Sequence, residues 1–292
     1  MDAKTPAVVK KFPVQDDGFT LVCSRRRKKR INKLCDLLAK HGGPEVLAID
    51  REEKSLSFKK DTLWDIQNEV ESSEYFKAFR ENLVTVLKHI NSSRTSSEDT
   101  LTEFDTKDPS INVDYTVDVI CYGLGNFASS VMSRYQLGFL LALKGTLGTT
   151  GCTQVYDPIF SKQEVAFLEE VGLDVLEVDE EAKRTVKRTT IFFMPHCDLH
   201  LYNNLFSANW NPKSLQNLIL IGNCLENYKL HLCGDRYRQQ AKYAYYVTGF
   251  ETEIAITNSF YLTDIFNDMS IHYFRLNDLP SAENDLWNDL GD

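Results

Sequence analysis

A strand followed by a glycine-rich turn is the part of this sequence with the clearest chemistry. Residues 117–128 read Val-Asp-Val-Ile-Cys-Tyr-Gly-Leu-Gly-Asn-Phe-Ala, so a short β-branched run ends in G-x-G-x-x-A. This pattern is typical of the phosphate turn in nucleotide-binding βαβ units. Gly123 permits a sharp turn, Gly125 lets the backbone approach an anion, and Ala128 lets helix and strand pack closely. We therefore predict a ligand site here, with no reaction assigned to it.

The helix after this turn is predicted to begin at Asn126 or Phe127. Its first N–H groups and the positive end of its dipole would then face the carboxyl edge of the strand, where an anion binds. Gly123, Gly125 and Asn126 are accordingly the first cofactor-binding candidates.

The next candidate is an acidic residue at the tip of a second strand. This strand, residues 153–157, follows after one helix and ends in Asp157. An acidic side chain at such a tip accepts hydrogen bonds from ribose hydroxyls, although the spacing exceeds the ~20 residues of the dinucleotide fingerprint. A predicted helix that runs to about Leu147 accounts for the longer spacing between the glycine turn and Asp157. The alternative stays open that the glycines only shape a tight turn and that Asp157 only caps the helix after Pro158.

His196 completes the set of candidates. In an open parallel sheet, ligands bind outside the carboxyl ends of the strands, where the strand order reverses. With the usual double winding, this point lies between the strand before Gly123 and the strand of residues 190–194. The latter strand ends in Met-Pro-His-Cys-Asp, so His196 and Cys197 are expected to face the same crevice. His196 is thus a cofactor-binding candidate, and the candidate acid or base if a reaction takes place.

The His-Cys-Asp-Leu-His run of residues 196–200 is compatible with a capped helix whose preceding histidine lines the crevice, and three site chemistries are weighed against this interpretation. A metal site would need both histidines on one helical face, yet Asp198 is placed as an N-cap, which leaves His196 outside the helix. We therefore predict no metal site. Adjacent side chains diverge, which disfavours Cys197 and His196 as a nucleophile and its base. Haem ligation by either residue is chemically allowed, but nothing in the spacing requires it.

Common enzyme signatures are missing from the chain. It contains no GxxxxGK[ST], HExxH or GxSxG, and no Tyr-x-x-x-Lys in its second half. A methyltransferase pocket and a dinucleotide pocket would use the same turn and the same acidic strand tip. The candidate cofactors therefore remain NAD(P), S-adenosylmethionine and haem.

Composition limits the classes of protein that fit. The 292 residues are 42% hydrophobic and 26% charged, as in ordinary globular proteins. No stretch approaches the ~20 apolar residues that span a bilayer, and residues 1–6 lack a signal-peptide core, so we expect no membrane association. The seven cysteines include no CxxC pair and are read as reduced thiols. With a net charge of −9, we do not expect the chain to have a general nucleic-acid-binding surface.

The elements after residue 112 alternate between strand and helix. Near-continuous apolar strands, such as Ile-Phe-Phe-Met and Leu-Ile-Leu-Ile, indicate a parallel sheet buried on both faces. We predict an α/β, doubly wound, Rossmann-like three-layer fold with a mostly parallel sheet and N-terminal helical additions. The predicted strands are 117–122, 153–157, 174–178, 190–194 and 217–222, and the predicted helices are 127–144, 162–171 and 199–208. Residues 245–248 and 271–274 are also strand-like but have no predicted place in the sheet.

Four parts are predicted along the chain. They are a basic N-terminal arm (1–40), a helical region with a flexible Ser/Thr-rich loop (41–110), the α/β domain (111–280) and an acidic tail (281–292). The block Arg25–Arg30 matches a nuclear-localisation or nucleic-acid patch, or a solvated arm. In the tail, Leu286, Trp287 and Leu290 have helical spacing, which suits either docking into a groove or packing on the chain's own domain.

Five blocks of residues resemble one family. They are Tyr-Gly-Leu-Gly-Asn-Phe from Tyr122, Ser-Arg-Tyr-Gln-Leu from Ser133, Tyr-Asp-Pro from Tyr156, Met-Pro-His-Cys from Met194, and Leu-Ile-Gly-Asn from Leu220. In this order they resemble the motifs of the Sensitivity-to-Red-Light-Reduced (SRR) domain family, over about residues 112–228. The Ser-Arg-Tyr-Gln-Leu block is the most specific of them.

The resemblance implies a regulatory protein rather than a known reaction. Proteins of this family are described as regulators linked to circadian-clock input, and so to biological rhythms, and to haem biosynthesis, in cytoplasm and nucleus. We therefore expect a regulator in those compartments with a nucleotide-like ligand pocket at Gly123–Gly125 and protein partners of unknown identity. The alternative is an NAD(P)-dependent or S-adenosylmethionine-dependent Rossmann-type enzyme.

Overall fold

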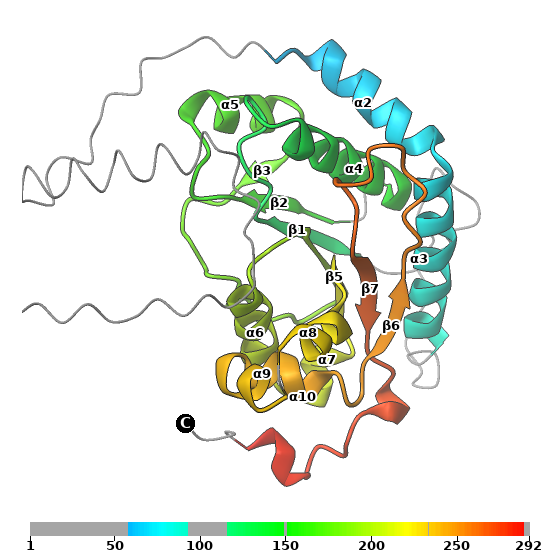
Figure 1. The fold of residues 1–292 in the computed structure, drawn as a ribbon, viewed down its shortest axis with the longest axis vertical. Helices are drawn as coiled ribbons and strands as arrows, with labels where there is room; N and C mark the ends of the chain where they lie inside the picture. The colour runs from blue at the N-terminus through cyan, green and yellow to red at the C-terminus, as the bar shows by residue number, and fades with distance from the viewer. Residues whose placement is uncertain (1–57, 93–115, 149–150, 233, 289–292) are drawn as a thin grey trace, which may run out of the picture. The chain divides into compact units, whose positions relative to one another are not determined.

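The computed structural model of the chain describes residues 58–92, 116–148, 151–232 and 234–288 (Figure 1). Within them, seven strands form one sheet in the order β3-β2-β1-β4-β5-β7-β6. The strands are β1 (Asp118–Tyr122), β2 (Thr153–Tyr156), β3 (Asp174–Val175), β4 (Thr190–Met194), β5 (Leu218–Asn223), β6 (Thr252–Ala255) and β7 (Met269–Tyr273). The first five pair in parallel, and β7 runs antiparallel to both β5 and β6.

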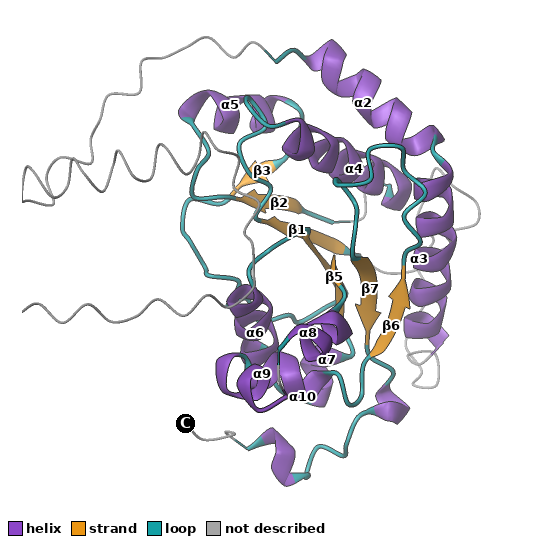
Figure 2. Ribbon diagram, viewed as in Figure 1, coloured by secondary structure: helices purple, strands orange, loops and turns teal. Residues whose placement is uncertain are grey.

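Helices cover both faces of the sheet, as Figure 2 shows. The helices are α2 (Lys60–Ser72), α3 (Glu74–Ser92), α4 (Val131–Leu147), α5 (Lys162–Glu170), α6 (Leu199–Ala208), α7 (Pro212–Leu215), α8 (Leu225–His231), α9 (Gly234–Gln240) and α10 (Lys242–Val247). Two short 3₁₀ turns, Leu276–Asp278 and Asp285–Trp287, follow the last strand. The predicted α/β class with a mostly parallel sheet between helical layers is confirmed.

Strand β1 illustrates how the sequence produces two cores. All five of its residues are buried, and their side chains alternate between the faces. Val119 and Cys121 join the core beneath α2, α3, α4 and α5. Ile120 and Tyr122 join the core beneath α6 to α10. A central parallel strand covered on both faces is therefore a continuous apolar run rather than an alternating one.

Helix α4 is the most deeply buried helix of the first layer. Apolar residues occupy most of its circumference because the sheet covers one side and α2 the other. Gly138 allows this approach, since a Cβ there would lie 2.8 Å from Cγ2 of Ile66 on α2. In the region 41–110, which was predicted to be helical with a flexible loop, the described residues form α2 and α3, which continue this layer.

The predicted start of α4 at Asn126 or Phe127 is wrong, because the helix begins at Val131. The physical reason is its cap. The Ser130 side chain accepts a hydrogen bond from the backbone N–H of Ser133, which is the usual N-cap contact. The end of the helix that carries the positive dipole is therefore displaced from the glycine turn.

A compact turn fills the gap between the glycines and α4. The Asn126 side-chain oxygen accepts from the backbone N–H and the hydroxyl of Ser129, at 2.8 and 2.6 Å. The Arg134 guanidinium donates to the carbonyl oxygens of Phe127 and Ala128, each at 2.7 Å. Side chains of the loop and of α4 thus satisfy backbone groups that a helix would otherwise have paired.

The two strand-like segments near the C-terminus have different outcomes. Residues 245–248 fall in and just after α10, so a strand there is wrong; Ala244 and Val247 lie three apart on its buried face. Residues 271–274 overlap β7, so that strand is confirmed. Short aromatic and β-branched runs suit either structure, and packing on α6 and α9 decides for a helix at α10.

The C-terminal segment packs on its own domain. The Trp210 indole N–H donates to the carbonyl of Leu286 at 2.7 Å, and the Trp287 ring lies 5.4 Å from that of Trp210 and 5.7 Å from that of Phe250. The basic block 25–30 and residues 93–100 of the predicted Ser/Thr-rich loop 91–100 lie outside the described residues, whereas the first two residues of that loop belong to the end of α3. Where the structure describes the chain, its helices are too short or too polar to cross a membrane.

Candidate functional site

The predicted site lies at the carboxyl end of β1, where the strand order reverses. Strand β1 pairs with β2 on one side and with β4 on the other, so the chain winds outward in both directions from it. This confirms the switch point expected between the strand before Gly123 and the strand 190–194. The turn that follows Tyr122 therefore stands where open α/β sheets bind ligands.

Gly123 is held tightly against a buried thiol. Its φ is +75°, a backbone conformation that favours glycine, and a Cβ there would lie 2.5 Å from Sγ of Cys197. The Cys197 thiol donates to the carbonyl of Tyr122, at 3.3 Å. The missing side chain of Gly123 thus makes room for Cys197, from the loop after β4.

Gly125 is closed by the acidic strand tip. Its φ is +79°, and its backbone N–H donates to Oδ2 of Asp157 at 2.7 Å. The second carboxylate oxygen of Asp157 accepts from the N–H of Ile159 at 3.0 Å. A Cβ on Gly125 would lie 2.6 Å from Oγ of Ser133. The structure therefore brings Gly125 and Asp157 together, but in a contact with each other.

A carboxylate that the sequence analysis missed fixes the rest of the turn. Glu164 is fully buried, and one of its oxygens accepts from the Ala128 N–H at 3.0 Å. The other oxygen accepts from the Asn126 amide at 3.1 Å and from the N–H and hydroxyl of Ser161. The Ser-x-x-Glu spacing of a capping box at Ser161 was the signal that could have indicated it.

His196 is directed toward β5 and the loop before β7. It adopts φ +53°, its N–H donates to the Asn223 side chain at 2.9 Å, and its ring Nε2 donates to the Ile265 carbonyl at 3.0 Å. These contacts hold the ring on the side of β4 away from β1 and β2. They do not join His196 to Gly125 or Asp157.

The buried thiols near the turn are neutral. Burial raises the pKa of the Cys197 thiol far above its usual range, with a smaller contribution from Asp157. Burial does the same for Cys121 on β1. A thiolate is the nucleophilic form of cysteine, so these two residues contribute packing at neutral pH.

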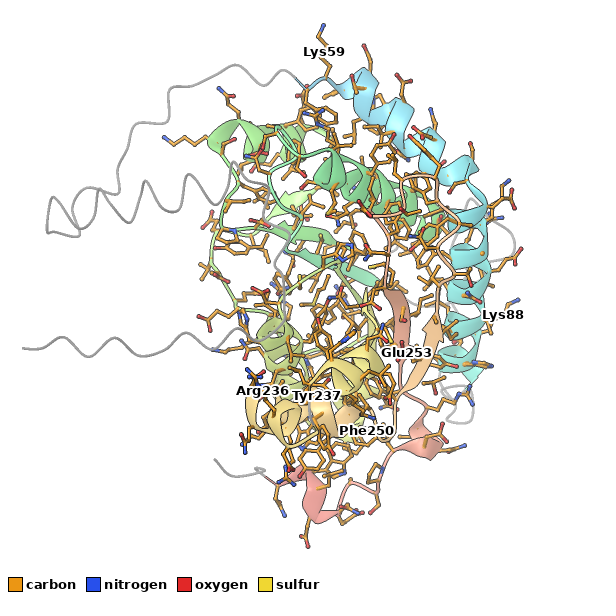
Figure 3. All side chains as sticks on the ribbon, viewed as in Figure 1. Lys59, Lys88, Arg236, Tyr237, Phe250 and Glu253 are labelled. Carbon is orange, nitrogen blue, oxygen red and sulfur yellow. The ribbon has the colours of Figure 1, made fainter. Side chains whose placement is uncertain are left out.

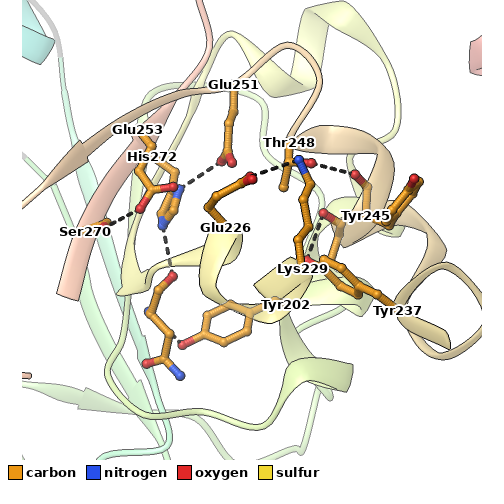
Figure 4. Close-up of polar contacts among 12 residues, drawn as sticks. Tyr202, Glu226, Lys229, Tyr237, Tyr245, Thr248, Glu251, Glu253, Ser270 and His272 are labelled. Atoms are coloured by element: carbon orange, nitrogen blue, oxygen red, sulfur yellow. Dashed lines mark hydrogen bonds and ion pairs between the residues drawn. The ribbon is translucent and has the colours of Figure 1, made fainter. Parts of the chain in front are cut away.

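A second group of polar side chains lies between the sheet and α8 to α10. We call Glu251, Glu253 and His272 the His272 cluster (Figure 4). Nδ1 of His272 lies 2.8 Å from Oε2 of Glu251, and a ligand atom from each residue lies within 4.8 Å of the others. His272 and Glu253 face each other across the β6–β7 pair. Glu253 stands on the sheet side of the helical layer that contains Tyr237 (Figure 3).

Both ring nitrogens of His272 face acceptor oxygens. Nε2 lies 3.0 Å from the Asn223 carbonyl, and Nδ1 faces the Glu251 carboxylate. Nε2 therefore donates its hydrogen to the carbonyl, and a second proton joins Nδ1 to the Glu251 carboxylate. Burial lowers the pKa of His272, but the charge and hydrogen bond of Glu251, together with Glu253 and the Asn223 carbonyl, raise it above its usual value.

The sequence analysis missed the whole His272 cluster. Its members come from residues 251–253 and 272, which the chain separates by a loop and only the β6–β7 pairing brings together. The available signal was alternation. Ser270 and His272 lie two apart and so share a face of β7, where a buried apolar residue is the usual occupant, and Glu251 and Glu253 have the same spacing at the start of β6.

Comparison with known proteins identifies the class. Residues 85–273 match the SRR1 domain, which is more than half of the chain, so the chain belongs to the SRR1 domain family. The resemblance seen in its motif blocks is thereby confirmed.

Among the relatives, the chain is 46% identical over 110 residues to a mouse SRR1-like protein, which covers 37% of this chain and 44% of that protein. It is 32% identical over 161 residues to the Arabidopsis thaliana protein Sensitivity to Red Light Reduced 1, covering 55% and 53%. A Drosophila melanogaster SRR1-like protein is 24% identical over 169 residues, covering 58% and 59%. The matched segments thus span about half the length of these relatives.

Proposed function

We propose that this chain is a regulatory protein of the SRR1 family, which acts in the input to a circadian clock and in the control of haem biosynthesis. Membership of the family supports a regulatory role, and one relative is named for a reduced sensitivity to red light. The clock and haem assignments come from what the family resemblance implies.

The observation that carries the proposal is the closed glycine turn. The Gly125 N–H already bonds Asp157, and Cys197 fills the space beside Gly123. A cofactor in constant use would need this amide and this carboxylate. A turn closed by its own groups instead favours a protein whose state changes when a ligand or partner opens it.

We propose that a nucleotide-like ligand opens the turn by exchange. An anionic group would replace Asp157 as the acceptor at the Gly125 amide, and a ribose would donate its hydroxyls to the released carboxylate. This exchange leaves no buried polar group unpaired. The Gly125 N–H would gain the anionic group as its acceptor, and the Asp157 carboxylate would gain the ribose hydroxyls as its donors. His196 remains a candidate for contact with the far end of such a ligand.

An S-adenosylmethionine-dependent enzyme is the second candidate, and a specific observation favours it. The strand order 3-2-1-4-5-7-6, with an antiparallel β7 between β5 and β6, is also that of Rossmann-type methyltransferase domains. In such an enzyme the turn after β1 and the acid at the tip of β2 would hold the cofactor. One fold hosts many functions, so a shared strand order supports this enzyme less strongly than the closed turn supports a regulatory protein.

Calorimetric titration with NAD, NADP, S-adenosylmethionine and haem tests the proposal. We expect one adenosine-containing compound to bind, and Asp157→Asn to weaken it at least about tenfold, which corresponds to about 1.4 kcal/mol. Asp174→Asn, an exposed aspartate on the neighbouring strand β3, is the matched control and should bind as the unaltered chain does.

The outcomes separate the candidates. Turnover of a bound cofactor at ordinary enzymatic rates would contradict the regulatory proposal and establish the enzyme. Absence of heat with all four compounds would remove the ligand site while leaving regulation through protein partners to be tested by pull-down.

We propose that the protein works in the cytoplasm and also enters the nucleus through the block Arg25–Arg30. Six adjacent cations in an acidic chain match the pattern of a nuclear-localisation segment. Replacing the block with glutamines should confine a fluorescent fusion to the cytoplasm. An unchanged nuclear fraction would contradict this role of the block.

A further inference from the structure

The donor atoms of the His272 cluster have the composition of a metal site. One imidazole nitrogen and two carboxylates lie within 4.8 Å of one another. This set of nitrogen and oxygen donors suits divalent ions such as Zn²⁺ and Mn²⁺. Ligands bound at about 2.0–2.2 Å to one tetrahedral ion lie about 3.4 Å apart, so Nδ1 and Oε2 of Glu251, now 2.8 Å apart, would have to separate slightly to admit it.

The partners around the cluster hold these donors in position. The Nε2–H of His272 donates to the Asn223 carbonyl at 3.0 Å, which leaves Nδ1, the nitrogen that faces Glu251, as the nitrogen available to a metal ion. The Ser270 hydroxyl donates to Oε1 of Glu253 at 2.7 Å, and the Cys224 thiol also bonds this carboxylate. A histidine that gives its other N–H to a carbonyl, and a carboxylate held by a hydroxyl, are the outer partners usual at metal sites.

Charge within the cluster is unbalanced without an ion. The side chain of His272 is fully buried and that of Glu251 is 5% exposed, with Glu253 half-buried beside them. Even as an imidazolium, His272 offsets only one of the two carboxylates. A divalent cation bound by a neutral imidazole and two carboxylates gives a net charge of zero, which lowers the cost of burying them.

The strands supply a rigid frame. Glu253 of β6 and His272 of β7 are directly paired, and Glu251 lies immediately before β6 begins. Sites built on paired strands hold their geometry better than sites on loops. The partial exposure of Glu253 leaves a path by which an ion can enter.

From these observations we infer that Glu251, Glu253 and His272 bind a divalent transition-metal ion between β6, β7 and the helical layer. On binding, the ion displaces the proton that joins Nδ1 of His272 to the Glu251 carboxylate, and this proton passes to solvent. Three protein ligands leave a further coordination position for water or for a group from a ligand, as in sites that are not purely structural.

Metal titration of the full chain tests this inference. We choose Mn²⁺ as the main probe, because carboxylates suit it and the chain's thiolates do not, and Zn²⁺ as a competitor. Isothermal calorimetry after removal of bound metal with a chelator should give one equivalent of Mn²⁺, displaced by Zn²⁺. Glu253→Gln removes one ligand but keeps the Glu251–His272 pair, and should weaken Mn²⁺ binding at least about tenfold.

The matched control is Glu226→Gln, on helix α8 close to the cluster, where the glutamate pairs with Lys229 instead. It should bind Mn²⁺ like the unaltered chain. If Glu253→Gln does not fold by circular dichroism, Ser270→Ala carries the test and should weaken binding several-fold. No uptake of either ion, or equal affinity in the unaltered chain and the cluster variant, would overturn the inference and leave the cluster as an ion pair alone.

Discussion

The glycine turn and the His272 cluster present opposite states of polar groups at the same sheet. At the turn, the carboxylate oxygens of Asp157 accept from two backbone N–H groups, and those of Glu164 accept from four N–H and O–H donors, so each oxygen has at least one donor. In the cluster, the Glu251 carboxylate contacts the His272 ring and the Glu253 carboxylate accepts from Ser270, so two carboxylates lie beside one ring that can carry a single positive charge. The region with the recognisable sequence motif has its polar groups bonded to one another, and the region without a motif holds the donors that we propose bind a metal ion.

The contrast teaches that a motif reports backbone shape before it reports binding. Gly123 and Gly125 are required by their positive φ and by close contacts with Cys197 and Ser133. Those constraints hold whether or not a ligand is present. Unbalanced buried charge is a separate indicator, and only the folded chain reveals it.

The largest effect is expected at the cluster. In protein stripped of metal, His272→Leu should lower the free energy of unfolding by about 3 kcal/mol, because it leaves Glu251 buried without its partner. Urea unfolding measures the loss. His200→Leu, at an exposed position on α6, is the control and should change stability little.

The loss at His272 should also depend on pH. The folded pKa of His272 is raised, so its stabilisation is fully present below the unfolded pKa of about 6.5 and disappears as pH rises through the folded value. The difference between the unaltered chain and His272→Leu should therefore be larger at about pH 6 than at about pH 9. A stability difference between the two proteins that grew as the pH rose would contradict the raised pKa of His272.

A smaller loss is expected at the turn. Glu164→Gln places an amide N–H₂ where the carboxylate accepted from several donors, and should cost about 2 kcal/mol. Glu169→Gln, exposed on the same helix, provides the control. Equal denaturation midpoints for these two variants would show that the turn does not depend on Glu164.

The smallest effect is expected at Gly125. Gly125→Ala should cost about 1–2 kcal/mol through its left-handed backbone, with a further loss from the contact at Ser133. Adding Ser133→Ala should recover the contact but not the backbone strain. Gly145→Ala, in the open part of α4, should instead be neutral or stabilising. Similar unfolding energies for the two alanine variants would contradict the strain.

Local patterns predicted much of the fold. Strand β4 and helix α6 match their predicted bounds, because a buried apolar run and a residue at the cap position are local signals. The predicted start of α4 was wrong because the side chain of Ser130 caps the helix. The side chain of Asn126 bonds Ser129 instead. The strand predicted for residues 245–248 was wrong because aromatic and β-branched residues occur in strands and helices, so packing determines which of the two forms.

The site was harder to predict for a physical reason. The contact of Gly125 with Asp157 follows from adjacent strand ends, and the sequence did place both residues there. That the two would bond each other depends on distances that no spacing encodes. His272, Glu251 and Glu253 meet only through the antiparallel pairing of β6 and β7, which sequence analysis did not place.

Hydrogen exchange at the Gly125 amide, followed by nuclear magnetic resonance, tests the closed turn most directly. We expect this amide to exchange slowly in the ligand-free protein, at a rate comparable with the amides of β1, because its N–H donates to Asp157 at 2.7 Å. Asp157→Ala should accelerate it while leaving the β1 amides protected. Fast exchange in the unaltered protein, like that of an exposed loop, would mean that the turn stands open and would contradict the account.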